Sequence, residues 1–216
     1  MSQIISIEGN IGSGKSTILK SIKEYFKDNS DIIFLQEPVD EWEEIKDKDG
    51  RTILSKFYEN QEKYSFSFQM MAYISRLVLL QNAIKMNPNS IIITERCLNT
   101  DRYVFAKMLY DNRKIEDIEY TIYLKWFDHF LNICDIQKTI YLKTDFNICY
   151  ERINKRNREG ESNISIEYLD KCHQYHEDMI NKISEKLLII DSNIDTDLNK
   201  DIINEWNQKI KNFIYQ

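Results

Sequence analysis

Eight residues near the amino terminus have the composition of a phosphate-binding loop. The segment GNIGSGKS, from Gly9 to Ser16, matches the pattern G-x-x-x-x-G-K-[ST] and lies between a predicted strand and a predicted helix, the context that the pattern needs. Its glycines let backbone N–H groups surround phosphate oxygens, Lys15 can reach the β- and γ-phosphates, and Ser16 can ligate Mg²⁺. A glycine-rich turn with a surface lysine is the weaker alternative. The residues expected to hold a nucleotide are Gly9, Asn10, Gly12, Ser13, Gly14, Lys15, Ser16 and Thr17.

Two carboxylates follow predicted strands and are expected to face this loop. Glu37 comes after the second predicted strand, where a general base for an alcohol acceptor would face the γ-phosphate across the crevice. Glu95 ends the third predicted strand and is a candidate Mg²⁺ ligand, while Arg96 beside it can hold an acceptor or a developing phosphoryl charge. Taken alone, Glu37 also fits a solvated loop, and the Glu95–Arg96 pair fits an ion pair at a sheet edge.

A charged segment around Gly160 has the features of a lid. Arg156 and Arg158 follow a predicted helix and precede Glu161, with the glycine as a hinge between them. In a phosphotransferase, such a segment can close over the nucleotide and neutralise the transferring group. The alternative is a solvated helix end. We place the predicted lid at approximately residues 155–164.

Strand-like and helix-like patterns alternate along the chain. Five parallel strands covered by helices on both faces would bring ligands to the carboxyl ends of the strands. The sequence therefore predicts an α/β fold with a five-stranded parallel sheet. The expected strands are Ile4–Glu8, Ile32–Gln36, Ile91–Thr94, Thr139–Leu142 and Leu187–Asp191. The expected helices are Lys15–Lys27, Asp40–Ile45, Ser55–Lys85, Asn99–Tyr110, Ile118–Ile133, Phe146–Arg156, Ser165–Lys186 and Ile202–Phe213.

Composition narrows the class of protein. The 216 residues fit a single domain, 1–216, and a net charge of −6 disfavours nucleic acid as a partner while allowing a local phosphate site. No apolar run is long enough for a membrane span, and a strand pattern starting at Ile4 leaves no room for a leader, so we expect a cytoplasmic protein. The four cysteines form no C-x-x-C pair and are expected to be reduced and mostly buried: Cys97, Cys134, Cys149 and Cys172.

Taken in order, these pieces resemble the deoxyribonucleoside kinase family, which includes deoxycytidine, deoxyguanosine, deoxyadenosine and mitochondrial thymidine kinases. The resemblance implies a P-loop kinase fold with an arginine-bearing lid, which moves the γ-phosphoryl group of ATP, with Mg²⁺, to the 5′-hydroxyl of a small deoxynucleoside. It also implies a homodimer. The matching segments are GNIGSGKST at Gly9, EPVDEW at Glu37, SFQMMAYISR at Ser67, ERCLNTDRYVFAKMLY at Glu95, IEYTIYLKWFDHFL at Ile118 and IYLKTDFNICYERINKRNREGESNISIEYLDKCHQYHE at Ile140.

The resemblance also implies residue roles. Glu37 is similar to the family's general base, Arg96 to the residue that holds this base and the reacting oxygen, and Glu95 to its Mg²⁺-associated carboxylate. Tyr58 and Glu161 fall where the family binds the sugar 3′-hydroxyl. Gln69 is placed to bond the edge of the base. The residues similar to the walls of the base site are Trp42, Phe68 and Phe105, and those similar to the lid arginines are Arg152, Arg156 and Arg158.

Arg76 and Asp101 concern the choice of base. Family members that prefer cytosine or purines resemble this chain in having these two charges, whereas thymidine-preferring members carry smaller or apolar residues there. The chemistry agrees, because an Asp can accept a hydrogen bond from the exocyclic amino group of the base. We therefore expect deoxycytidine or a purine deoxynucleoside to be favoured over thymidine. A buried ion pair without a ligand role is the alternative. Departures from the family pattern are Cys97 for a serine and Ser165 for a proline.

Two rival classes remain. A nucleoside monophosphate kinase of the thymidylate kinase type shares the sheet and lid, but its acceptor is a dianion that Glu37 would repel. A GTP-dependent switch would carry an N-K-x-D motif, which the chain lacks, and the D-x-x-G match at 47–50 lies in a polar loop. The monophosphate kinase is the nearer rival.

Overall fold

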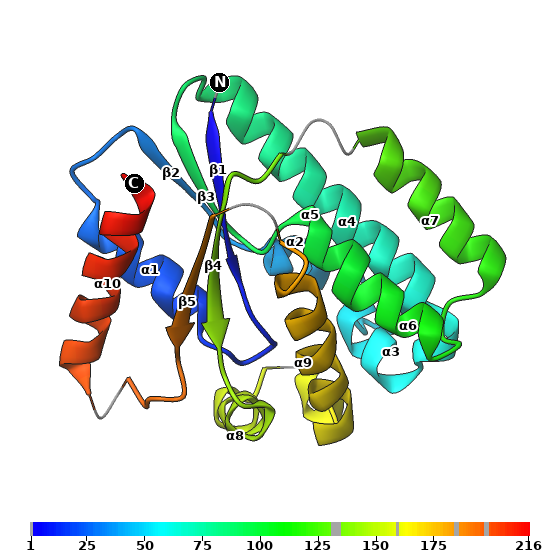
Figure 1. Cartoon of the computed structure of the whole chain (residues 1–216). Coiled ribbons are helices and arrows are strands. Elements are labelled where there is room, and N and C mark those ends of the chain that lie inside the picture. Colours follow the sequence, from blue (N-terminus) through cyan, green and yellow to red (C-terminus); the bar gives the residue numbers. More distant parts are fainter. Residues whose placement is uncertain (1, 131–134, 159, 184–185, 197–198) are drawn as a thin grey trace.

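A computed structural model of the 216-residue chain describes residues 2–130, 135–158, 160–183, 186–196 and 199–216. All five strands run parallel in one sheet with the order β2-β3-β1-β4-β5 (Figure 1). This confirms the predicted α/β fold. The strands are β1 (Gln3–Glu8), β2 (Ile32–Leu35), β3 (Ile91–Glu95), β4 (Lys138–Lys143) and β5 (Lys186–Asp191).

Helices cover both faces of the sheet, with α1 and α10 on one side and the long α4 on the other (Figure 1). The helices on the first side are α1 (Lys15–Tyr25) and α10 (Lys200–Ile214). Around the rest of the sheet lie α2 (Val39–Glu44), α3 (Ile53–Glu59), α4 (Gln61–Met86), α5 (Leu98–Thr100), the π-helix Asp101–Ala106, α6 (Lys107–Asp111), α7 (Asp117–Phe130), α8 (Phe146–Arg156), the short 3-10 helix Glu161–Asn163 and α9 (Ile166–Ile180).

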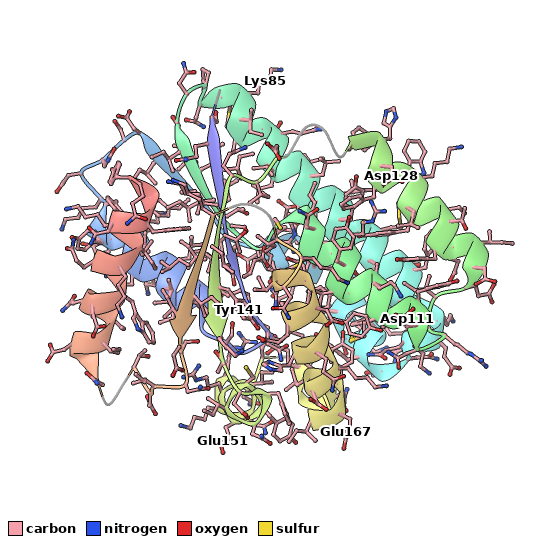
Figure 2. The ribbon with its side chains drawn as sticks, viewed as in Figure 1. Lys85, Asp111, Asp128, Tyr141, Glu151 and Glu167 are labelled. Atoms are coloured by element: carbon pink, nitrogen blue, oxygen red, sulfur yellow. The ribbon has the colours of Figure 1, made fainter. Side chains whose placement is uncertain are left out.

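Successive strand residues serve opposite faces of the sheet, as the period of two requires. Ile5 and Ile93 pack with α1 and α10, whereas their neighbours Ile4 and Ile92 pack under Leu80 of α4. The central strands β1 and β3 are buried on both faces and are mostly apolar, whereas the edge strand β5 keeps Ile189 exposed. Figure 2 shows side chains filling the space between sheet and helices. The polar end of Tyr141 on β4 is satisfied by donation to Glu177 of α9 at 2.7 Å.

Two long helices of the sequence prediction are wrong in part. The expected helix Ser55–Lys85 is two helices, because Asn60 has φ −147° and its side chain accepts from the N–H of Lys63, so it caps α4. The expected helix Ser165–Lys186 ends at Ile180, and Lys186 instead opens β5 opposite Lys138.

The other differences are smaller. The segment 99–110 is helical as expected but contains a π-helix at Asp101–Ala106. The expected helix end at 131–133 lies outside the described residues, as does Cys134. Cys97, Cys149 and Cys172 are free and buried, as predicted. No helix in the described ranges is both long and apolar enough to cross a lipid bilayer.

Candidate active site

A cavity of about 730 Å³ opens at the carboxyl ends of the strands. Its lining includes the loop after β1, Glu37 after β2, Glu95 at the end of β3 and Ser192 after β5. The fold thus brings the predicted residues together, although Gly9 and Asn10 do not line the cavity. Those that do are Gly12, Ser13, Gly14, Lys15, Ser16, Thr17, Glu37, Trp42, Tyr58, Phe68, Gln69, Arg76, Glu95, Arg96, Asp101, Phe105, Arg152, Arg156, Arg158 and Glu161.

The loop between β1 and α1 requires glycine at Gly9 and Gly12. Both have positive φ, 148° and 80°, and a Cβ on Gly12 would lie 2.5 Å from the carbonyl oxygen of Cys149 on α8. Asn10 ties the loop to α9, because its side-chain NH₂ donates to the carbonyl of Leu169 at 2.9 Å. Its Oδ1 accepts from the N–H of Ile11 within the loop. The loop therefore wraps closely around the start of α1.

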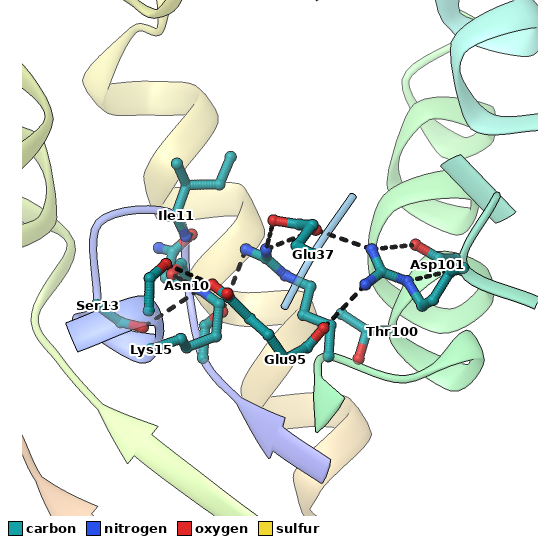
Figure 3. Close-up of polar contacts among 12 residues, drawn as sticks. Asn10, Ile11, Ser13, Lys15, Glu37, Glu95, Thr100 and Asp101 are labelled. Atoms are coloured by element: carbon teal, nitrogen blue, oxygen red, sulfur yellow. Dashed lines mark hydrogen bonds and ion pairs between the residues drawn. The ribbon is translucent and has the colours of Figure 1, made fainter. Parts of the chain in front are cut away.

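Lys15, the first residue of α1, is buried within this loop. Its Nζ donates to the carbonyl of Asn10 at 2.6 Å (Figure 3). Burial and, after it, the nearby Arg96 cation lower the pKa of Lys15 to about 7, against the opposing effects of Glu95 and Glu37. An anionic phosphate in the cavity would restore the charged form of this lysine.

Ser16 and Glu95 meet at the edge of the cavity, where the Ser16 hydroxyl donates to Glu95 Oε1 at 2.7 Å. The other carboxylate oxygen of Glu95, Oε2, is buried and has no hydrogen-bond partner. A hydroxyl and a carboxylate beside a phosphate loop suit Mg²⁺, which keeps few protein ligands and takes the rest from phosphates and water. The donor set fits this ion.

Glu37 is the centre of the charged cluster in Figure 3. Its carboxylate accepts from Arg96 Nη1 at 2.8 and 3.0 Å and from Arg76 Nη2 at 2.8 Å. Burial raises the pKa of Glu37, but the two guanidinium groups and Lys15 outweigh burial and lower it to about 2. The carboxylate is therefore ionised throughout the neutral range.

Arg96 approaches Glu37 from an unusual backbone conformation. Its φ is +62°, and its N–H donates to the carbonyl of Ile7 at 3.0 Å, which continues the pairing of β3 with β1. Its guanidinium also lies over the ring of Phe105, 5.2 Å from the centroid. A left-handed non-glycine residue is strained, and such strain occurs where a side chain must be aimed.

The other end of the cavity is apolar. Phe68 packs edge-on against Trp42, with ring centroids 5.6 Å apart, and stacks on Phe57 at 4.5 Å. Gln69 is buried among them, and its Oε1 has no hydrogen-bond partner. A ligand with a flat aromatic ring could pack against these side chains, and a hydrogen-bond donor on the edge of its ring could reach the unpaired amide oxygen of Gln69.

The predicted lid segment contacts α3, the helix that carries Tyr58. Glu161 accepts from Arg156 at 2.6 and 2.8 Å and from Arg158 at 3.4 Å. Burial, and the Glu161 carboxylate after it, raise the pKa of the Tyr58 phenol, which stays a hydrogen-bond donor. Arg152 lies elsewhere, with its Nη2 donating at 3.0 Å to carbonyls that follow β5.

Sequence reasoning missed several residues of this site. Leu54, Phe57, Ala72 and Tyr168 also line the cavity. Their helical apolar spacing resembles that of core residues, so no signal in one sequence separates them. Glu8 does not line the cavity, but it too was missed as a buried charge: it ends β1, is fully buried and accepts from the Thr100 hydroxyl at 2.5 Å. A charged residue at the end of an otherwise apolar strand was the signal available for it.

Comparison with known proteins agrees with this geometry. A family model described as "Deoxynucleoside kinase" matches residues 5–215. The probable deoxycytidine kinase of fowlpox virus is 35% identical over 199 residues, covering 89% of this chain and 79% of the relative. Human deoxycytidine kinase is 35% identical over 190 residues, covering 80% of this chain and 73% of the relative.

Human mitochondrial thymidine kinase 2 is 33% identical over 181 residues, covering 83% of this chain but only 64% of that protein. The matched part is thus a little under two thirds of this relative's length. With the family model covering nearly the whole chain, the resemblance seen in the sequence is confirmed. The chain belongs to the deoxynucleoside kinase family, whose members phosphorylate nucleosides with ATP.

Proposed function

We propose that the chain transfers the γ-phosphoryl group of ATP to the 5′-hydroxyl of a deoxynucleoside and serves nucleotide salvage. The observation that carries the proposal is the position of Glu37. It is an ionised carboxylate held by Arg96 and Arg76, and it faces the same cavity as Lys15 and the aromatic walls around Phe68. An acceptor whose base lies against Phe68 brings its sugar hydroxyl towards Glu37.

In the proposed mechanism the chain mainly binds and orients. Backbone N–H groups of the loop and Lys15 hold the phosphates, and Arg96 neutralises charge that develops on the transferring group. As the 5′-oxygen bonds to the γ-phosphorus, the bond from that phosphorus to the bridging oxygen breaks and ADP leaves; the proton of the hydroxyl, made far more acidic by the new bond, passes to Glu37. A weak base therefore suffices. Mg²⁺, held by Ser16 and Glu95, would supply further neutralisation of phosphate charge.

The finer features of the substrate follow from the same site. We assign the sugar 3′-hydroxyl to Tyr58 and Glu161, because a phenol and a carboxylate line the cavity beside the lid. Arg76 and Asp101 favour a base with an exocyclic amino group, so deoxycytidine or a purine deoxynucleoside is preferred to thymidine. A cytoplasmic location and a single domain stay predictions from the sequence.

The rival acceptor is a nucleoside monophosphate. Its phosphate would have to lie beside Glu37, whose negative charge is fixed by a pKa of about 2. The two guanidinium groups that could attract a phosphate already bond this carboxylate. We therefore favour the uncharged hydroxyl as acceptor.

The test is ADP release with four deoxynucleosides and with their monophosphates. Deoxynucleosides should support turnover, and Glu37→Gln should lower kcat by roughly 10²-fold or more while keeping deoxynucleoside affinity. Glu44→Gln, an exposed carboxylate at the end of α2, is the matched control and should behave as wild type. Turnover only with monophosphates would favour the rival, and unchanged kcat in Glu37→Gln would exclude Glu37 as the base.

We also propose that two chains form a homodimer through α4 and α7. These neighbouring helices expose apolar side chains on successive turns, Ile74 and Val78 on α4 and Ile118, Ile122 and Trp126 on α7. Scattered exposed apolar residues are ordinary, but two adjacent rows support an interface with another apolar surface. The family resemblance favours a second copy of the chain as that partner.

A further inference from the structure

Arg76 bonds three acceptors that belong to different parts of the site. Its Nε donates to Asp101 Oδ2 at 2.9 Å, its Nη1 to the carbonyl of Glu95 at 2.9 Å, and its Nη2 to Glu37 Oε1 at 2.8 Å (Figure 3). Both carboxylates line the cavity; Asp101 is the residue proposed above to read the base, and Glu37 the proposed general base. One side chain therefore touches both.

The geometry leaves Arg76 little freedom. The guanidinium is planar and rigid, and the side chain is only 3% exposed, so water cannot replace a lost partner. Its Nη2 is shared, lying 2.8 Å from Glu37 Oε1 and 3.4 Å from Asp101 Oδ1. A movement of the guanidinium towards one carboxylate lengthens the bond to the other.

We infer that Arg76 is a positioning residue that transmits the identity of the bound base to Glu37, so that discrimination between bases appears in kcat and not in KM alone. The inference rests on the proposed function. A base whose amino group donates to Asp101 leaves the ion pair as it is. A base that presents a carbonyl there repels Asp101, which displaces Arg76 with it.

A shift of Arg76 would change the orientation of the Glu37 carboxylate. When Arg76 shifts, Glu37 loses the shorter of the two bonds to its Oε1 and is held by Arg96 Nη1 alone, which bonds both of its oxygens. The carboxylate then rotates away from the 5′-hydroxyl, and small errors in position are costly for proton transfer. A simple structural ion pair would instead leave the chemical step alike for every base that binds.

Deoxycytidine and deoxyuridine are the probes, because they differ at the 4-position and the adjoining ring nitrogen and neither carries the 5-methyl group of thymidine. We expect the single-turnover rate at saturating nucleoside to be at least tenfold higher for deoxycytidine in the wild-type enzyme. If the two rates agree and only KM differs, the inference is wrong. Absence of turnover with any deoxynucleoside would instead overturn the proposed function.

Two variants extend the test. Asp101→Asn keeps the shape of the side chain but should reduce the rate ratio between the two nucleosides at least fivefold, although residue 101 does not touch the 5′-hydroxyl. Gln69→Ala removes a contact to the base from a side chain with no bond to Arg76 or Glu37, so it should change KM and preserve the rate ratio. If both variants alter the rate ratio equally, Arg76 does not transmit the identity of the base to Glu37. If Asp101→Asn does not fold, the wild-type comparison still decides.

Discussion

Lys15 is the residue whose ionisation is most closely tied to ligand. Without phosphates it is a buried cation near Arg96, and its pKa falls to about 7. Phosphate oxygens raise that pKa again, because an opposite charge favours the protonated form. At pH 8 the free protein is mostly deprotonated at Lys15, so nucleotide binding must be accompanied by proton uptake. Above pH 7, affinity for nucleotide should therefore decrease as pH rises.

We predict an uptake of more than half a proton per bound ATP at pH 8, measured by calorimetry in two buffers of different ionisation enthalpy. Lys15→Arg is the matched variant, because arginine stays protonated and the uptake from this position should vanish. Lys15→Ala should lose phosphoryl transfer altogether while folding normally. A heat of binding that is the same in both buffers for the wild type would contradict the assignment.

The charged residues of the site could be predicted largely from the sequence, and the apolar ones only in part. Glu37 and Glu95 could be recognised because each lies at the end of an apolar strand. The carboxyl ends of parallel strands meet at the edge of the sheet where ligands bind. Phe57 could not be recognised, since an aromatic residue at helical spacing serves a core equally well. The bridge that Arg76 forms to Glu37 depends on packing between α4 and the loop after β2, which no local pattern encodes.

Among the elements, the strands were predicted well because buried parallel strands have a strong apolar signal. The helix boundaries were harder. At Asn60 the apolar pattern continues across the break, so only the cap reveals two helices. The π-helix at Asp101–Ala106 has the same apolar spacing as an α-helix would have, although such segments often occur at functional sites. Both errors lie next to residues that line the cavity.

The predicted lid segment lies against the start of α3 at Gly160. Gly160 has φ +83°, and a Cβ there would lie 3.0 Å from Cα and 3.2 Å from N of Ser55 at the start of α3. Gly50 is a matched control, because its φ is +81° but a Cβ would meet nothing within 4 Å. In both variants the backbone strain costs about 1 to 2 kcal/mol, and only Gly160→Ala adds a backbone clash.

We predict that Gly160→Ala raises KM for the deoxynucleoside at least fivefold, because the lid can no longer seat Glu161 beside Tyr58. Gly50→Ala should lower thermal stability without that increase in KM. A 2′,3′-dideoxynucleoside should itself be a poor substrate, because its missing hydroxyl leaves polar groups unpaired, and the increase in its KM caused by Gly160→Ala should be smaller. Steady-state kinetics on both nucleosides decides this. An equal change of KM in the two glycine variants would show that the contact of Gly160 with α3 does not affect binding of the deoxynucleoside.

At the scale of the whole molecule, the charged side chains are unevenly distributed. The chain carries a net charge of −6, yet seven cationic side chains of the described residues line one cavity: three come from separate parts of the chain and four from the segment 152–158. Composition alone left room for a local phosphate site, but only the fold brings these side chains together. They are Lys15, Arg76, Arg96, Arg152, Lys155, Arg156 and Arg158.

The exposed faces of α4 and α7 give the last prediction, which concerns assembly. In light scattering after size exclusion, the wild type should have the mass of two 26.0 kDa chains, and Val78→Glu with Ile122→Glu should have the mass of one, since the charges would be desolvated in an interface. Ile189→Glu is the matched control, because this side chain is 53% exposed on β5 at the far edge of the sheet. The cavity lies within one chain, so the monomeric variant should keep activity at assay temperature. A monomeric wild type at micromolar concentration would exclude the proposed dimer, and a dimer that survives both charges would place the interface elsewhere.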